Sequence, residues 1–104
     1  MKDIFRRVLR DSHLDMLKDL EPERASDHLF QSGAFNDDDC EHVKNAGTRR
    51  ERCKVFLDTL RRGGDEAYYV FLEALEKESM SHLAKKLRCL EAYPFCYLLR
   101  HSYV

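Results

Sequence analysis

The 104-residue sequence has no uninterrupted apolar run that approaches the ~20 residues a helix needs to cross a bilayer. It also has few apolar β-branched residues in strict alternation, the pattern of half-buried strands. We therefore expect a soluble, all-α domain with no membrane partner. A chain of this length buries roughly two-thirds of its unfolded surface, which suffices for one small core and leaves no room for a second domain.

The sequence also lacks an excess of charge of either sign. Its 18 lysines and arginines are offset by 19 aspartates and glutamates, so the formal net charge is -1. A nearly neutral chain has no global field that attracts nucleic acid. Any role of charge in partner choice must therefore depend on local patches.

No secretory signal is predicted, because Met1-Lys2-Asp3 leads into a segment dense in arginine and acid. The cysteines are therefore expected to be reduced thiols in a cytoplasmic protein. They are Cys40, Cys53, Cys89 and Cys96.

The sequence offers little for chemistry at these thiols. Cys40 and His42 place two possible metal ligands close together, but no Cys-x-x-Cys or paired-histidine motif completes a zinc site. Cys40 and Cys53 fall on predicted core stripes, where a thiol behaves as a small hydrophobe. We expect no metal, no cofactor, no small-molecule substrate and no catalytic residue, so the chain is predicted not to be an enzyme. The histidines are expected at helix surfaces or edges without an obvious partner: His13, His28, His42 and His82.

Amphipathic spacing predicts a first helix with apolar residues on one face and arginines on the other. Its apolar phase shifts past Asp11-Ser12, which predicts a bend in this helix. The predicted apolar positions are Ile4, Phe5, Val8, Leu9, Leu14, Leu17 and Leu20.

Proline and glycine mark the next two helices. Glu21-Pro22 begins the second, because proline suits the first helical position, and Gly33 ends it. Asn36 is expected to cap the third helix, which Gly47 ends. The predicted buried side of the second helix consists of Ala25, Leu29 and Phe30.

Three further helices complete the prediction. Thr48 and Glu51 have capping-box spacing at the start of the fourth, Asp65 is expected to cap the fifth, and Ser79 to begin the sixth. Their apolar faces are Cys53, Phe56, Leu57 and Leu60, then Ala67, Tyr68, Phe71, Leu72 and Leu75, then Met80, Leu83, Leu87 and Leu90. Short connections favour antiparallel neighbours, and hence a six-helix antiparallel bundle.

One stretch joins two of these helices around a glycine corner: Leu57-x-x-Leu60-x-x-x-Gly64-x-x-Ala67-x-x-x-Phe71-Leu72-x-x-Leu75. It resembles the corner between the fourth and fifth helices of caspase recruitment domains (CARDs), a branch of the death-fold superfamily. The arginine-rich first helix, the Asn45-Ala46-Gly47 stop and the following Arg49-Arg50-Glu51-Arg52 are most similar to initiator-caspase prodomains and adaptor CARDs.

The resemblance covers residues 1–91 and implies a CARD-like bundle with a bent first helix. It does not cover residues 92–104, an apolar C-terminal tail of unknown role. That tail either folds back on the bundle or forms an exposed patch for a partner.

The resemblance further implies that the first and fourth helices expose one face and the second and third another. The basic face consists of Arg6, Arg7, Arg10, Arg49, Arg50, Arg52 and Lys54. The acidic face consists of Asp27, Asp37, Asp38, Asp39 and Glu41. Two faces of opposite charge on one domain can bind head to tail.

The function implied by this resemblance is homotypic CARD–CARD interaction, which assembles apoptotic or inflammatory signalling complexes. The expected partner is another CARD-containing protein, a caspase or an adaptor, with a second copy of the chain itself as a further candidate. Two other interpretations remain. The charges could simply solvate helix surfaces and complement helix dipoles. Alternatively, the chain could be a small helical nucleic-acid-binding domain whose basic patch contacts phosphates, although its net acidity argues against this.

Overall fold

Ser12 divides the first predicted helix into two. Its backbone (φ −98°, ψ 8°) leaves the helical region, and its buried hydroxyl donates to the Val8 carbonyl oxygen at 2.8 Å. A serine hydroxyl that bonds the carbonyl four residues back bends a helix. The bend predicted past Asp11-Ser12 therefore takes the form of a break, and the predicted count of six helices is wrong.

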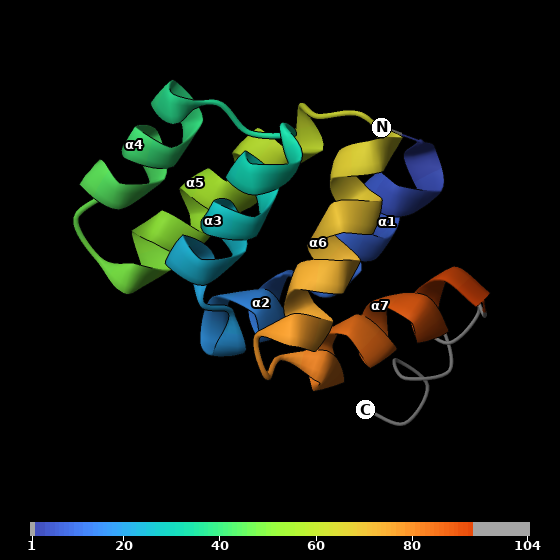
Figure 1. Cartoon of the computed structure of the whole chain (residues 1–104). Coiled ribbons are helices and arrows are strands. Elements are labelled where there is room, and N and C mark those ends of the chain that lie inside the picture. Colours follow the sequence, from blue (N-terminus) through green and yellow to red (C-terminus); the bar gives the residue numbers. More distant parts are fainter. Residues whose placement is uncertain (1, 93–104) are drawn as a thin grey trace.

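The computed structural model describes residues 2–92, and within that range it contains seven helices and no strand (Figure 1). The all-α class is confirmed. The helices are α1 (Asp3–Asp11), α2 (His13–Asp19), α3 (Pro22–Ser32), α4 (Asp37–Asn45), α5 (Arg49–Arg61), α6 (Asp65–Lys77) and α7 (Ser81–Ala92). Of the predicted tail at 92–104, Ala92 ends α7 and the other residues lie outside the described range.

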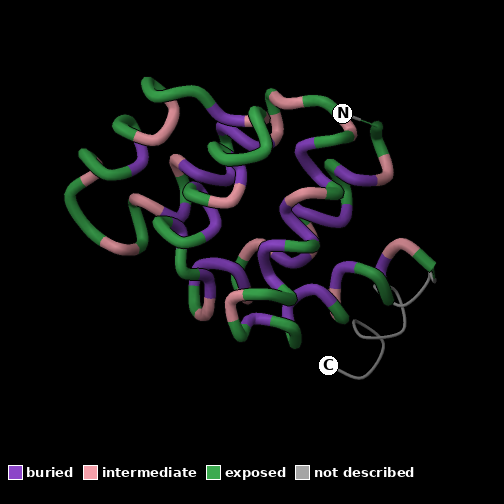
Figure 2. Tube along the Cα trace, in the orientation of Figure 1, coloured by how far each residue is buried: buried purple, intermediate pink, exposed green. Residues whose placement is uncertain are grey.

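The helices surround a single core. Helix α3 packs against α4, α5 and α6, while α7 packs against α1, α2 and α6. Figure 2 shows buried positions recurring along most of the helices and turned toward the core, whereas α4 is almost wholly exposed or half-buried. Among the described residues, no helix is both long and apolar enough to cross a membrane.

Aromatic side chains connect the two ends of the core. Phe5 of α1 stacks on Tyr68 of α6, with ring centroids 4.1 Å apart. Phe56 of α5 contacts Phe71 at 5.4 Å and Phe35 at 5.5 Å. The Tyr68 hydroxyl donates to a carboxylate oxygen of Glu91 at 2.7 Å, and burial together with this hydrogen bond raises the Tyr68 pKa. The prediction that Tyr68 lies in the core is confirmed.

Two residues assigned to the core lie elsewhere. Leu14 is 74% exposed and Phe30 is 47% exposed. Phe30 directly follows the buried Leu29, and so it is rotated from Leu29 by about 100° around the helix. Leu14 lies two positions before the buried Met16, and so it is rotated from Met16 by about 200°. Cys40 and Ile4, also expected on apolar stripes, are half-buried and pack against the core.

The predicted start of α4 is confirmed, and Gly33 ends α3 in the left-handed conformation (φ 88°). The Asn36 side chain accepts from the Asp39 N–H at 2.8 Å, and the Asp39 carboxylate accepts from the Asn36 N–H at 3.1 Å. At α5, the Thr48 hydroxyl oxygen accepts from the Glu51 N–H at 3.1 Å. These side chains satisfy backbone donors that have no partner within the helix.

The predictions for two other helix starts, at Asp65 and Ser79, were wrong. Gly64 rather than Asp65 occupies the cap of α6, and the Asp65 carboxylate accepts from the Lys2 N–H at 2.9 Å. Ser79 lies in the left-handed region (φ 63°) between α6 and α7. A helix cannot begin through that conformation, and α7 starts at Ser81.

Truncating the core at the α5–α6 corner should unfold the domain. Leu60 and Phe71 are fully buried, and removal of a buried apolar side chain costs roughly 2–5 kcal/mol out of a typical total of about 5–15 kcal/mol. We expect Leu60→Ala and Phe71→Ala each to lower the midpoint of thermal unfolding followed by circular dichroism. The exposed Glu73→Ala on α6 is the control. Unchanged melting curves for both core variants would contradict this core assignment.

Candidate functional site

Three residues of the predicted acidic face act on one thiol at the contact between α3 and α4. The Cys40 Sγ atom lies 3.8 Å from the Ser26 carbonyl oxygen, to which it donates. Burial raises the pKa of Cys40, and the negative charges of Asp27, Asp39 and Asp37 raise it further, while the positive charge of Lys44 opposes them. Asp27 of α3 and two aspartates of α4 thus influence the same sulfur.

Most of the acidic face is open to solvent. Asp39 is the exception, because it is half-buried and its carboxylate completes the capping box with Asn36. The exposed members are Asp27, Asp37, Asp38 and Glu41. These side chains are available to a partner.

The predicted basic face divides into exposed and internally engaged cations. The exposed members are Arg6, Arg7 and Arg10 on α1 and Arg50 and Lys54 on α5. Helix α1 packs chiefly against α7. Arg49 and Arg52 are half-buried and contact other parts of the same chain.

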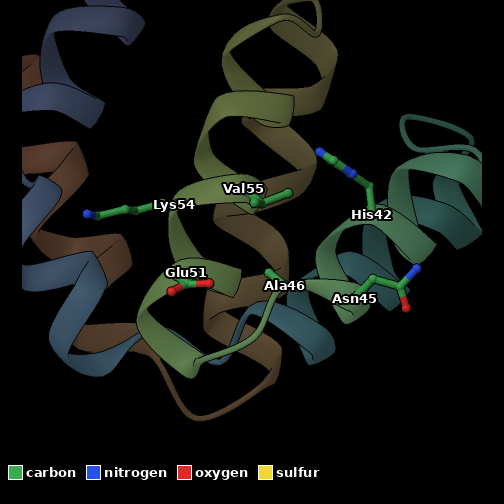
Figure 3. A pocket seen from close by; sticks show the side chains of 6 residues that line it. All are labelled: His42, Asn45, Ala46, Glu51, Lys54 and Val55. Atoms are coloured by element: carbon green, nitrogen blue, oxygen red, sulfur yellow. The ribbon is translucent and has the colours of Figure 1, made fainter.

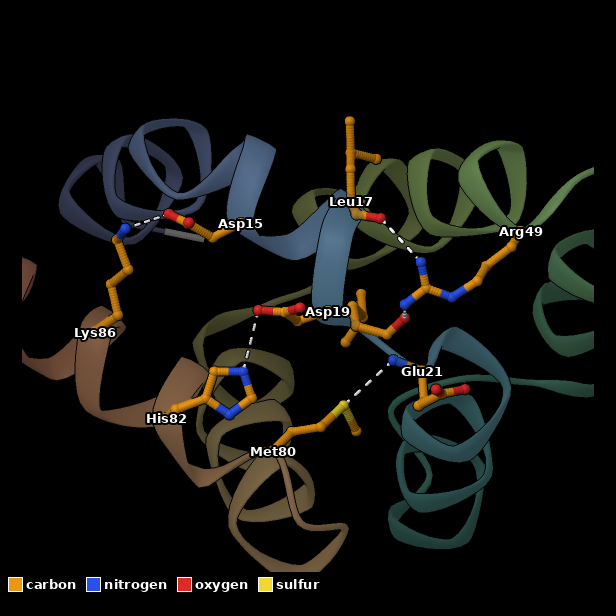
Figure 4. Close-up of polar contacts among 9 residues, drawn as sticks. Asp15, Leu17, Asp19, Glu21, Arg49, Met80, His82 and Lys86 are labelled. Atoms are coloured by element: carbon orange, nitrogen blue, oxygen red, sulfur yellow. Dashed lines mark hydrogen bonds and ion pairs between the residues drawn. The ribbon is translucent and has the colours of Figure 1, made fainter.

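Arg49 fastens the start of α5 to the end of α2 (Figure 4). Its two terminal nitrogens donate to the carbonyl oxygens of Leu17 at 3.1 Å and Leu20 at 2.7 Å. The last carbonyls of a helix lack partners within it, and the helix dipole places partial negative charge there. Arg49 therefore has a structural role in joining α2 to α5.

Arg52 is held at the junction of three elements. Its Nε atom lies 2.9 Å from a Glu23 carboxylate oxygen on α3, and its Nη1 donates to the Ala46 carbonyl oxygen at 3.4 Å. The spacing along α5 in the sequence could have separated the internally engaged arginines from the exposed cations. Arg49, Arg52 and Cys53 share the inward side of α5, whereas Arg50 and Lys54, four residues apart, share the outward side.

Charged side chains of α5 act on His13, the first residue of α2. Burial lowers the pKa of His13, and the positive charges of Arg61, Lys54 and Arg50 lower it further, while Asp58 opposes them. The His13 Nδ1 atom is buried and has no hydrogen-bond partner among residues 2–92. Arg61, which pairs with Asp58 at 3.3 Å, was missed because it lies at the far end of α5 from the arginine cluster.

Charged pairs join α2 to α7 on the other side of α2 (Figure 4). Lys86 pairs with Asp15, and His82 lies 3.2 Å from Asp19. Leu14 and Lys18, four residues apart and both exposed, lie on another side of α2. The prediction that His82 has no partner was wrong.

His28 likewise has a partner. Its Nε2 atom lies 2.9 Å from a carboxylate oxygen of Glu78, between α6 and α7. Sequence spacing could not reveal this contact or that of His82, because each partner lies 50 residues or more away in the chain.

A surface hollow of about 500 Å³ lies between α4 and α5 (Figure 3). Lys54 extends away from His42, so the polar groups around the hollow do not converge on one point. The described residues contain no group of three or more His, Cys, Asp or Glu side chains placed to hold a metal ion. The hollow is lined by His42, Asn45, Ala46, Glu51, Lys54 and Val55.

The all-α architecture agrees with the comparison to known families. A family model described as the caspase recruitment domain matches residues 6–89. The chain belongs to the CARD family.

Relatives of this CARD are much longer proteins. It is 31% identical to apoptotic protease-activating factor 1 of Danio rerio over 87 residues, which cover 84% of this chain and 7% of that protein. It is 28% identical to caspase-1-A of Xenopus laevis over 88 residues, which cover 84% of this chain and 21% of that protein. Human caspase recruitment domain-containing protein 9 is 35% identical over 72 residues, 66% of this chain and 13% of that protein. The chain thus spans about a fifth or less of the length of these relatives.

Adjacent arginines at the start of α5 should differ sharply in their effect on stability. Loss of the Arg49 hydrogen bonds leaves two carbonyls of α2 without a charged donor, so we expect Arg49→Ala to lower the free energy of unfolding by about 1–3 kcal/mol. Arg50→Ala removes the same charge from the same helix end. It should nevertheless change the free energy of unfolding by less than about 0.5 kcal/mol, because Arg50 is exposed. Urea unfolding of the two variants would check this. Equal losses would contradict the assigned role of Arg49.

The lowered pKa of His13 should make stability pH-dependent. The unfolded chain, with a pKa near 6.5, binds a proton more readily than the folded CARD does. The contribution of His13 to stability is therefore full above pH 6.5 and is lost as the pH falls below that value. We expect the stability of wild type relative to His13→Gln to decrease on acidification in urea unfolding between about pH 8 and 5. A constant difference, or one that grows toward acid, would contradict the prediction.

Proposed function

We propose that this CARD binds another CARD by setting its basic face against the acidic face of the partner, or the reverse. The observation that carries the proposal is that exposed charges of opposite sign lie on different helices. Arg50 and Lys54 are exposed on α5, whereas Asp27 on α3 and Asp37, Asp38 and Glu41 on α4 are exposed. Patches of opposite sign on one small domain suit complementary docking, and they raise the rate of encounter with the correct partner.

The proposed role of that contact is recruitment into apoptotic or inflammatory signalling complexes in the cytoplasm. The relatives include an apoptotic protease-activating factor and a caspase, which makes a caspase or an adaptor the proposed partner. A domain that brings effector chains together raises their effective concentration, so proximity alone can drive their activation. In this proposal the chain contributes docking and no chemical step.

The structure changes which cations are assigned to that contact. Arg50 and Lys54 are exposed on the outward side of α5 and act directly on His13. Arg49 and Arg52 are committed to the Leu17 and Leu20 carbonyls and to Glu23. We assign direct partner binding to Arg50, Lys54 and the α1 arginines, and a supporting role to Arg49 and Arg52.

Nucleic-acid binding is the competing function for the same cations. Asp58 and Glu51 lie on the same helix as Arg50 and Lys54, and the net charge is -1. A phosphate backbone would meet these carboxylates along with the cations, which weakens the attraction. Titration with labelled duplex DNA at low salt tests this alternative.

Reversal of the exposed basic face should abolish partner binding without unfolding the domain. We expect Arg50→Glu with Lys54→Glu to weaken binding to the immobilised CARDs of the three relatives by at least about tenfold, since complementary charges become like charges across the contact. Exposed charges contribute little to stability, so unfolding should change by less than about 1 kcal/mol. Arg52 is left unchanged because a glutamate there would face Glu23.

The matched control is Lys77→Glu with Lys85→Glu, which alters the net charge equally on exposed positions of α6 and α7. It should bind as wild type does. Wild-type binding should also weaken with salt, because the Debye length falls from ~30 Å at 0.01 M to ~8 Å at 0.15 M. A folded Arg50→Glu, Lys54→Glu variant that still binds a CARD as wild type does would refute the proposal.

A further inference from the structure

The outward side of α6 carries an aromatic ring that neither charged face uses. Tyr69 is 50% exposed, whereas the adjacent Tyr68 is buried and its hydroxyl donates to Glu91. Within residues 2–92 the Tyr69 hydroxyl has no hydrogen-bond partner. A single exposed tyrosine is ordinary on a protein surface, so the surroundings of the ring determine what it can bind.

The Tyr69 ring is held in one orientation by the core. Its centroid lies 5.4 Å from that of Phe5 on α1 and 6.0 Å from that of Tyr68, with interplanar angles of 77° and 70°. Figure 1 shows α1 beside α6. Both contacts have the edge-to-face geometry that aromatic pairs prefer. Because Phe5 and Tyr68 are buried, a ligand that packs on the exposed part of the Tyr69 ring does not have to immobilise it.

Two carboxylates lie before and after this ring on the same helix. Glu66 is three residues before Tyr69 and Glu73 four residues after it, and residues at these spacings are neighbours on one helix surface. Both glutamates are exposed, and neither forms an ion pair or hydrogen bond within the described range. They are roughly 10 Å apart along the axis, at about 1.5 Å per residue. We call Glu66, Tyr69 and Glu73 the α6 surface.

Cations of the same chain already engage the groups at both ends of α6. Near its start, the Lys2 Nζ atom lies 5.8 Å from the Phe5 ring centroid, a cation–π distance, and the Lys2 N–H donates to Asp65 at 2.9 Å. Near its end, Arg88 of α7 pairs with Glu76. The α6 surface between them offers the same kinds of groups, a ring and carboxylates, but no cation of residues 2–92 pairs with it.

We propose that the α6 surface is a second docking site, and that its occupant is an arginine side chain presented by a protein partner. A guanidinium can stack on the Tyr69 ring while its N–H groups donate to the carboxylate of Glu66 or Glu73. Charge complementarity supports this occupant, because α6 contains four acidic residues and a single lysine. The same charge repels partners that carry phosphate.

The site is separate from the charged-face contact proposed above, which involves α1, α3, α4 and α5. It also differs from the acidic residues of α4 in a way that can be measured. Helix α4 contains carboxylates but no phenylalanine or tyrosine. A carboxylate alone attracts arginine and lysine to a similar extent, whereas a tyrosine ring favours the planar guanidinium. A preference for arginine should therefore be found on α6 and not on α4.

The test is a titration of the nitrogen-15-labelled 104-residue chain with the peptide acetyl-Gly-Arg-Gly-Gly-Arg-Gly-amide, followed by NMR at an ionic strength of about 0.15 M. In an extended peptide its two arginines are roughly 10 Å apart, which matches the spacing of Glu66 and Glu73. We expect saturable shifts of the α6 amide signals. The same peptide with lysines should bind α6 at least about threefold more weakly, while both peptides should act alike on α4.

Variants of Tyr69 separate the ring from the charge. Tyr69→Leu keeps an apolar side chain against Phe5 but has no π face. It should weaken binding of the arginine peptide at least about threefold and remove the preference over lysine. Tyr69→Phe retains the ring and should bind as wild type does. Circular dichroism checks that each variant is folded.

Variants of the carboxylates test the charge. Glu66→Gln with Glu73→Gln should weaken the binding of both peptides to α6. The matched control is Asp38→Asn with Glu41→Gln, which removes the same charge from exposed positions of α4. It should leave the α6 shifts unchanged.

The outcomes distinguish this site from other occupants. Equal affinity of α6 for the arginine and lysine peptides, or unchanged binding in Tyr69→Leu, overturns the proposal, and so do shifts confined to α4. Shifts of α6 that depend on protein concentration without peptide would identify a second copy as the occupant, and shifts caused only by duplex DNA would identify nucleic acid. Either result overturns the choice of arginine.

The proposed function is tested independently. Arg50→Glu with Lys54→Glu should leave peptide binding to α6 unchanged, and Tyr69→Leu should bind the immobilised CARDs of the relatives as wild type does. If Tyr69→Leu loses that binding while remaining folded, the α6 surface belongs to the CARD contact and its assignment as a separate site is overturned.

Discussion

None of the seven helices described between residues 2 and 92 is long enough to be stable alone. They run from seven to 13 residues, and isolated helices shorter than about 12–15 residues are marginal in water. Each must therefore bury its one apolar stripe against the others. This requirement fixes which residues point outward before any partner is present, among them the exposed members of the two proposed charged faces.

The same requirement explains how far the sequence alone could predict the structure. Apolar spacing identified the stripes of α5, α6 and α7, and Asn36 and Gly33 marked helix ends through chemistry within a few residues of them. The break at Ser12 appeared as a phase shift, but its extent depends on one hydroxyl that bonds Val8. Leu14 and Phe30 were misassigned because hydrophobicity predicts burial only where a neighbouring helix is present to cover the residue.

The charged residues show the corresponding limit for the candidate site. Their number and sign can be read from the sequence, but whether a cation is available to a partner depends on long-range contacts. Arg49 reaches carbonyls about 30 residues earlier in the chain, while Arg50 beside it remains exposed. The inward register of Arg49 and Arg52 with Cys53 was a usable signal. The sequence contains no comparable signal for the partners of His28 and His82. Only the packing of α7 and of the turn before it brings those groups together.

The core also sets the angle between the two faces. Phe56 of α5 contacts Phe35, which precedes α4, and Phe71 of α6, while Arg49 ties α5 to α2. Helix α5 is thus joined both to α2 and to the segment that begins the acidic helix. Closely packed interiors resist deformation, so the two faces keep one relative orientation. The angle at which the two proposed faces meet a partner therefore follows from the packing inside the domain.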